Sequence, residues 1–352
     1  MHKHGGDIYS HPNFIDFSAN INFLGVPEAV KKATHNALQE ITHYPQPGSV
    51  RLCQAVAEME HVKPEQVICG NGAADVIFSL VLAEKPKKAL IPAPTFQEYE
   101  QALLSVNCQV EVVNTLKEKT SEIVSEESFL DKVMDDIDMV FFCNPNNPTG
   151  LLKEREYLLR LLQKCEKTGV RLVVDECFLD FVSGAEDVTM KPFLEKYKCL
   201  FLVKAFTKMF AIPGIRLGYG LSSDKSLLEK MKQVTQPWNV SVIAQEAGMA
   251  AAKELGFMER TREAVAEEKG YLLEELKQLP VEIYGHAANF IFFKAEKGLE
   301  KKLEQYHILI RDCSNFRGLE KGWYRIAVRS RTENQTLLQG MREALLIEET
   351  LS

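Results

Sequence analysis

The chain has 352 residues and a formal net charge of −7, so it is long enough for a large core and too acidic to favour nucleic acid or an anionic membrane as its partner. No apolar run reaches the length of a membrane span, and residues 1–6 lack the apolar core of a signal peptide. The eight cysteines are scattered without a CxxC pair, several of them inside apolar runs, as in reduced cytosolic proteins. We therefore expect a cytoplasmic enzyme of two associated domains, with no metal, nucleic-acid or membrane partner.

The N-terminal part is predicted to be an extended segment followed by two helices. Residues 15–22 favour the extended segment, which ends in a turn. The first helix begins at Pro27, where the missing N–H costs nothing, and carries apolar residues at helical spacing to residue 41. A loop rich in proline and glycine at 43–48 precedes the second helix, at 50–59.

From residue 65 onward, apolar runs alternate with segments long enough for crossover helices, of which 154–167 is the clearest. The runs lie at 67–69, 89–91, 110–113, 139–143, 172–174 and 200–203. Near-continuous apolar strands that alternate with helices predict a mostly parallel sheet covered on both faces. Ligands of such sheets bind at the carboxyl ends of the strands, so the residues that follow the runs are the candidates for a site.

Four of these strand ends carry residues with possible roles in binding. A glycine-rich turn at 70–75 enters a helix and can hold a phosphate on free backbone N–H groups. Phe96 places an aromatic ring at the crevice, the loop 144–150 presents amide side chains, and Asp175 is an acid at the end of an apolar strand. Each alone is typical of a turn or a helix cap, whereas their joint occurrence indicates one binding crevice.

The stretch 201–220 adds a lysine and an arginine after a further buried strand. Lys208 is costly to bury as an ammonium, and a buried lysine is suited to forming an imine with a carbonyl compound. Arg216 offers a guanidinium fork for a phosphate. An imine-forming lysine beside a phosphate-binding arginine suggests pyridoxal 5′-phosphate (PLP), although the two residues taken alone are equally typical of surface cations.

The last third is predicted to be a smaller α+β domain. Helices are expected at 243–255, 258–276, 299–305 and 333–346, and strands at 281–284, 289–293, 308–311 and 324–328. We expect three parts: an N-terminal segment at 1–42 that packs with the small domain, a large PLP-binding domain at 43–238, and the small C-terminal domain at 239–352.

Together, the motifs GNG at 70–72, NPNNPTG at 144–150, VVDE at 173–176 and TK…PGIRLGYG at 207–220 resemble the fold-type I PLP enzymes of the aminotransferase superfamily, over essentially the whole chain. The resemblance implies an α/β fold with a large domain, whose mostly parallel central sheet is flanked by helices, and a smaller α+β domain.

The flanking segments carry a finer resemblance, to the L-threonine-O-3-phosphate decarboxylases. They are HGG at 4–6, DFSANIN at 16–22, DECFLDF at 175–181, ILIRDCSNF at 308–316 and YRIAVRS at 324–330. Histidinol-phosphate aminotransferases share the core motifs and fewer of these flanks. Two departures from the superfamily pattern are Ala205, where a serine is common, and Phe178, where many aminotransferases have a tyrosine and the decarboxylases do not.

The resemblance implies a role for each matching residue. Lys208 binds PLP covalently, Asp175 pairs with the ring nitrogen, Asn147 binds the ring oxygen, and Phe96 stacks on the ring. The cofactor phosphate is held by Arg216, Thr207, Gly72, Ala73 and Ala74. Tyr44 reaches the phosphate of the other subunit's cofactor, which implies a homodimer. The substrate ligands correspond to His4, Gly5, Asn20, Asn147, Arg311 and Arg325.

The predicted function is the PLP-dependent decarboxylation of L-threonine O-3-phosphate to (R)-1-amino-2-propanol O-2-phosphate for cobalamin biosynthesis. The main alternative is a histidinol-phosphate aminotransferase or a related aminotransferase. A preference for serine phosphate also stays open, because one methyl group gives weak discrimination. A PLP-binding regulator is a further alternative, but such proteins carry a DNA-binding segment ahead of this fold, for which we expect no room here.

Overall fold

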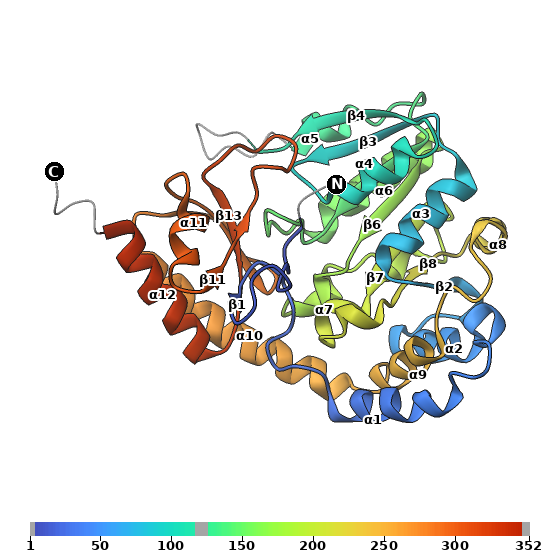
Figure 1. The fold of residues 1–352 in the computed structure, drawn as a ribbon. Coiled ribbons are helices and arrows are strands. Elements are labelled where there is room, and N and C mark those ends of the chain that lie inside the picture. The colour runs from blue at the N-terminus through green and yellow to red at the C-terminus, as the bar shows by residue number, and fades with distance from the viewer. Residues whose placement is uncertain (1–3, 117–125, 347–352) are drawn as a thin grey trace.

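The computed structural model describes residues 4–116 and 126–346, and within these residues a seven-stranded sheet forms the centre of the larger part (Figure 1). The strand order is β2-β8-β7-β6-β5-β3-β4, and all neighbours are parallel except that β8 runs antiparallel to β2 and β7. The strands are β2 (Val67–Gly70), β3 (Lys88–Ala93), β4 (Gln109–Asn114), β5 (Met139–Cys143), β6 (Arg171–Asp175), β7 (Leu200–Ala205) and β8 (Gly218–Leu221). The predicted mostly parallel sheet is confirmed.

Helices cover both faces of this sheet because successive strand residues point to opposite sides. Val173 belongs to a core cluster with residues of α3 (Ala73–Glu84), α4 (Gln97–Leu104) and α8 (Lys225–Val234). Its neighbour Val174 belongs to the cluster on the other face. The helices that contribute to this second cluster include α2 (Val50–Glu60), α6 (Arg155–Thr168), α9 (Val242–Ala251) and the short α5 (Glu126–Leu130).

The smaller part is built on a four-stranded antiparallel sheet in the order β12-β13-β10-β9. Its strands are β9 (Glu282–Gly285), β10 (Phe290–Lys294), β12 (Arg311–Asp312) and β13 (Trp323–Ala327), and its helices are α10 (Leu255–Leu276), α11 (Leu299–Glu304) and α12 (Arg331–Leu346). In Figure 1, this part lies to the left of the large sheet, with α10 running beneath both. The predicted smaller α+β unit is confirmed.

The expectation of a single strand at 308–311 was wrong. The structure has two short strands there, because the chain changes partners at Ile310. β11 (Ile308–Leu309) pairs in parallel with β1 (Ile15–Asp16), and β12 then pairs with β13.

The N-terminal segment contacts both parts of the molecule. β1 pairs with β11 of the smaller part. By contrast, α1 (Glu28–Ala37) packs against α9, which also packs against α2 (Figure 1). The boundaries at residues 42 and 238 stay a prediction.

A close contact joins the two parts beside the loop 144–150. Ala287 N donates a hydrogen bond of 2.9 Å to Gly150 O. A Cβ atom at Gly285 would overlap Thr149 O, so only glycine fits there without a backbone shift. This contact holds the β9–β10 turn against the loop that carries Asn147.

Candidate active site

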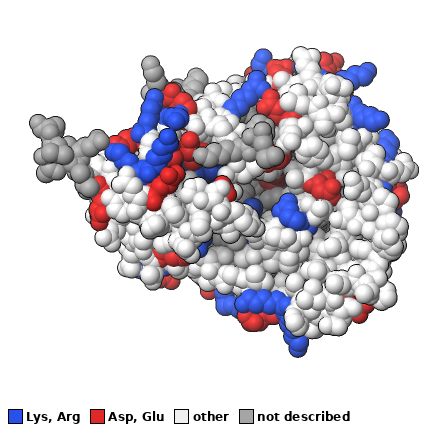
Figure 2. All heavy atoms as spheres, viewed as in Figure 1, with Lys and Arg blue, Asp and Glu red and all other residues white. Residues whose placement is uncertain are grey.

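A cavity of about 200 Å³ lies between the two parts, at the carboxyl ends of β5, β6 and β7 and opposite β12 and β13. Figure 2 shows this face of the molecule hollowed where the parts meet. Thirteen of the fifteen predicted site residues line the cavity. They are His4, Gly5, Asn20, Ala73, Ala74, Phe96, Asn147, Asp175, Thr207, Lys208, Arg216, Arg311 and Arg325. Gly72 and Tyr44 are not part of its lining.

One end of the cavity is built to receive an anion. Helix α3 follows Gly72, whose φ of 93° is unfavourable for other residues, and its first turn begins with Ala73 and Ala74. A Cβ atom at Gly72 would lie 2.6 Å from Arg216 Nη2, so the glycine makes room for the guanidinium beside the helix N-terminus. The free N–H groups of a helix start and an adjacent arginine form a phosphate site. Thr207 also lines the cavity.

Lys208 lies on the short helix α7 (Phe206–Met209) that follows β7. Burial, with the nearby charge of Arg325, lowers the pKa of Lys208 to about 8. Within the described residues its ammonium makes no hydrogen bond or ion pair. A neutral amine is therefore accessible near physiological pH, as imine formation requires.

Asp175 ends β6 in a buried position. Its Oδ1 accepts a hydrogen bond of 2.9 Å from Cys177 N, and its Oδ2 accepts one of 2.5 Å from the Tyr99 hydroxyl. Burial raises the pKa of Asp175, and these two hydrogen bonds oppose that increase. The sequence analysis did not identify Tyr99. It lies three residues after Phe96 at the start of α4, and the two rings make an edge contact with centroids 5.5 Å apart.

Two arginines form the opposite wall. Arg311 and Arg325 are direct partners across the β12–β13 pair, and both side chains are buried. Arg325 donates to Asn147 Oδ1 and, at 2.9 Å, to Ser18 O, while its Nε has no partner among the described residues. Burial lowers the pKa of Arg325 to about 10, so it stays charged at neutral pH.

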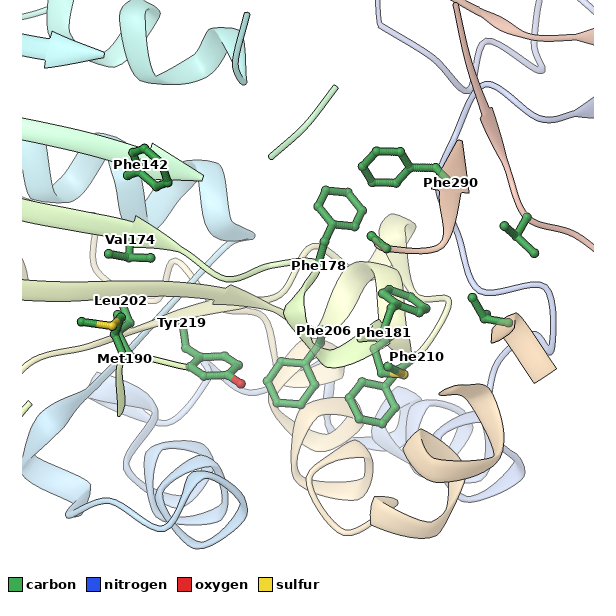
Figure 3. Packing of buried hydrophobic residues seen from close by; sticks show 14 of the residues in the cluster. Phe142, Val174, Phe178, Phe181, Met190, Leu202, Phe206, Phe210, Tyr219 and Phe290 are labelled. Atoms are coloured by element: carbon green, nitrogen blue, oxygen red, sulfur yellow. The ribbon is translucent and has the colours of Figure 1, made fainter. Parts of the chain in front are cut away.

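Aromatic rings support both guanidinium groups. Arg311 lies over Phe316, with 5.1 Å from Cζ to the ring centroid, and Arg325 lies over Phe290 at 5.4 Å. Phe178, which lines the cavity, points toward Phe290 (Figure 3) and makes an edge contact with it at 5.2 Å. Phe290 was expected only as part of a strand. Its role under Arg325 depends on tertiary packing and has no sequence signal.

The donor set fits PLP. The phosphate, the ring nitrogen and the aldehyde need an anion site, a buried carboxylate and a reactive lysine, and the cavity provides them at Arg216, Asp175 and Lys208. Another buried polar atom, Asn20 Oδ1, has no partner among the described residues. Buried polar atoms are nearly always hydrogen-bonded, so this oxygen marks a position for a ligand donor.

Tyr44 lies outside the cavity of its own chain. Its ring is 77% exposed and stacks on Trp238, with centroids 4.4 Å apart. Within the described residues there is no group of three or more side chains that could hold a metal ion, and no helix has the length and apolarity to cross a membrane.

Comparisons with known proteins agree with this arrangement. The family model of aminotransferase class I and II matches residues 12–341. The threonine-phosphate decarboxylase of Salmonella typhimurium is 34% identical, and the match covers 97% of this chain and 96% of that protein.

Two solved structures share the fold and at least a quarter of the sequence. The histidinol-phosphate aminotransferase of Clostridium acetobutylicum superposes with a TM-score of 0.87 at 28% identity, covering 94% of this chain and 98% of that chain. The L-threonine-O-3-phosphate decarboxylase of Porphyromonas gingivalis gives a TM-score of 0.81 at 26% identity, covering 94% and 99%. The predicted fold and both predicted resemblances are confirmed.

Proposed function

Because the chain belongs to the aminotransferase class I and II family, we propose that it uses PLP to decarboxylate L-threonine O-3-phosphate to (R)-1-amino-2-propanol O-2-phosphate. The full-length similarity to a threonine-phosphate decarboxylase supports this reaction. The proposal includes a role in supplying this amine to cobalamin biosynthesis. It also includes a cytoplasmic location, which is supported by the free state of all eight cysteines.

Five of the cavity's features correspond to parts of the cofactor. PLP supplies an electron-accepting ring that takes up the electrons of the bond broken at the substrate's α-carbon. Lys208 provides the amine for covalent attachment, and Asp175 keeps the ring nitrogen protonated. Arg216 and the start of α3 bind the phosphate, and Phe96 covers the ring. Asn147 Oδ1 already accepts from Arg325, which leaves the amide N–H groups of Asn147 to donate to the ring oxygen.

The pairing of Arg311 and Arg325 across β12 and β13 supports a phosphorylated substrate. Two adjacent guanidinium groups suit a phosphate dianion, which accepts several charge-assisted hydrogen bonds at once. Among the described residues, Arg325 donates hydrogen bonds only to the neutral oxygens of Asn147 and Ser18, so its charge is available to a substrate anion.

The orientation of the substrate decides which of its bonds breaks. A decarboxylase must break the bond between the α-carbon and the carboxylate, whereas an aminotransferase keeps the carboxylate and removes the α-proton. With the phosphate on Arg311 and Arg325, we infer that His4 and Asn20 would hold the remaining groups of the substrate so that the bond to its carboxylate is the one that breaks. Lys208, in its protonated form, then returns a proton to the α-carbon.

The arginine pair can be tested by substitution. Arg311→Ala and Arg325→Ala should each lower kcat/KM for threonine phosphate about 30-fold to several-thousand-fold, because each leaves part of the phosphate unpaired. Both variants should keep the PLP absorbance. Arg317→Ala is the matched control, since Arg317 is exposed and pairs with Glu100 outside the cavity. Equal turnover of free threonine and threonine phosphate by the unsubstituted protein would contradict a phosphate site at these arginines.

We also propose that the protein is a homodimer. The resemblance to the family implies that Tyr44 contacts the cofactor of the other subunit. In this structure Tyr44 is exposed and lies outside the cavity of its own chain. This position suits a residue that completes the site of a second copy.

A further inference from the structure

The segment of residues 4–6, here called the N-terminal strap, is fixed against Ser18 of the N-terminal segment. Gly6 N donates a hydrogen bond of 2.7 Å to Ser18 Oγ. A Cβ atom at Gly5 would overlap Ser18 O, so the strap packs directly on this backbone. The same Ser18 O accepts a hydrogen bond from Arg325 Nη2. Ser18 therefore contacts both the strap and one of the two arginines proposed to bind the substrate phosphate.

The other contact of the strap crosses to the larger part. His4 Nδ1 lies 3.5 Å from Glu98 Oε1, within ion-pair distance when His4 is protonated. Glu98 lies in the first turn of α4, and its side chain is only 15% exposed, against 57% for His4. The strap therefore spans the cavity, from Ser18 on one side to Glu98 on the other.

Glu98 also lies near the cationic groups of the cavity. It lines the same cavity as Lys208 and Arg311. Burial lowers the pKa of both, and the negative charge of Glu98 opposes this decrease in each case. A shielded carboxylate among cationic groups is well placed to attract a protonated imidazole. It is poorly placed to bind a phosphorylated substrate itself, because the two negative charges repel.

We propose that Glu98 is a positioning residue that holds His4 across the cavity, so that the N-terminal strap closes over the bound substrate. This inference rests on the proposed function, in which His4 is a substrate contact. Glu98 acts through His4: it restrains an otherwise exposed terminal residue and thereby reduces the entropy lost when the substrate is bound.

A double-mutant cycle distinguishes a role of Glu98 through His4 from a role that is independent of His4. Glu98→Gln keeps the shape of the side chain and removes its charge. It should raise KM for threonine phosphate about two- to fivefold, as expected for a partly exposed ion pair, with a smaller change in kcat. In the His4→Ala background, Glu98→Gln should have no further effect. Glu100→Gln, with the same charge change on the same helix but outside the cavity, is the control and should leave KM unchanged.

Hydrogen exchange measures the strap without any turnover. Amide exchange in a peptide that contains Gly6 should be about two- to fivefold faster in Glu98→Gln than in Glu100→Gln. If the unsubstituted protein does not turn over threonine phosphate, the proposed function fails. The comparison of amide exchange in the two variants then tests the role of Glu98 by itself. Equal exchange in the two variants, or a further loss from Glu98→Gln in the His4→Ala background, would overturn the role of Glu98.

Discussion

Lys204 and Lys208 lie four residues apart and have opposite surroundings. Lys204 is buried and forms ion pairs of 2.8 Å with Glu60 and 2.9 Å with Asp180. These carboxylates raise its pKa despite the burial that opposes them. Lys208 has no such partner among the described residues, and burial lowers its pKa to about 8. These surroundings are those of a structural cation at Lys204, and they support the proposal that Lys208 is the reactive amine.

Replacement of these two lysines should separate their roles. Lys208→Ala should lose the borohydride-reducible PLP adduct and nearly all turnover, because Lys208 is the one lysine among the described residues that line the cavity. Lys204→Ala should keep the adduct and lose up to about 3–5 kcal/mol of stability, because the half-buried Asp180 loses its ion-pair partner and the buried Glu60 retains Lys191 alone of its two lysines. Peptide mapping after borohydride reduction locates the adduct. A reduced adduct on Lys204 would show that the assignment is wrong.

The same lysine predicts a pH dependence. Only the neutral amine attacks the aldehyde of free PLP, and with a pKa of about 8 its neutral fraction rises through this range rather than near the ordinary value of 10.5. Covalent attachment to cofactor-depleted protein should accelerate as pH increases from about 7 to 9 and then level off. A rate that still rises steeply above pH 10 would contradict the lowered pKa.

Asp175 and Tyr99 can be tested as a pair. Asp175→Asn removes the charge that keeps the PLP ring nitrogen protonated, and turnover should fall about 10²-fold or more while PLP stays bound through its phosphate. Tyr99→Phe removes one donor to the carboxylate and should cause a smaller loss. Rates and PLP absorbance of both variants check this. Near-normal turnover by Asp175→Asn would exclude the assigned role.

At the scale of the elements, the contact between the β9–β10 turn and the loop 144–150 should be sensitive to a single methyl group. Gly285→Ala places a Cβ against Thr149 O and should cost about 1–3 kcal/mol of stability. It should also lower activity, because the loop carries Asn147. Gly270→Ala is the control: its Cβ meets no atom within 4 Å, and in helix α10 it should stabilise by about 0.5–1 kcal/mol. Thermal unfolding distinguishes them, and equal midpoints would contradict the tight contact.

The sequence predicts strands with a continuous apolar run better than elements without one, for a physical reason. The apolar runs of β5, β6 and β7 are buried on both faces, so their composition alone indicates strands. β8 was not predicted, because its sequence GYGL is rich in glycine and it forms a strand only between β2 and β7. Helix α8 was also missed, although Asp224 caps it through a hydrogen bond from Leu227 N.

At the scale of the whole molecule, the motifs predicted which residues meet but not what supports them. Residues as distant as Asn20 and Arg325 were assigned to one site through resemblance, and the structure brings them into one cavity. Tyr99, Ser18 and Glu98 were not predicted, because their roles arise from contacts with residues that are distant in the sequence. A hydroxyl, a backbone oxygen and a helical glutamate have no distinguishing pattern in the sequence. The individual roles of the site residues stay predictions.

The proposed homodimer can be tested at Tyr44. If the Tyr44 hydroxyl reaches the cofactor phosphate of the second subunit, Tyr44→Phe should weaken PLP retention by a few-fold without changing the unfolding temperature, because the loss is one charge-assisted hydrogen bond at an exposed residue. Equilibrium dialysis measures retention, and sedimentation measures the assembly. A fully active monomer would contradict this arrangement.

We propose that this protein decarboxylates a phosphorylated amino acid instead of transferring its amino group. The most direct measurement is the release of carbon dioxide from threonine phosphate by the purified protein with PLP, with and without 2-oxoglutarate. We expect one carbon dioxide and one phosphorylated amine per substrate consumed, at a rate independent of the keto acid. Histidinol phosphate with 2-oxoglutarate serves as the comparison and should react poorly. Turnover that requires 2-oxoglutarate and yields a phosphorylated aldehyde or ketone would contradict the decarboxylase and identify an aminotransferase.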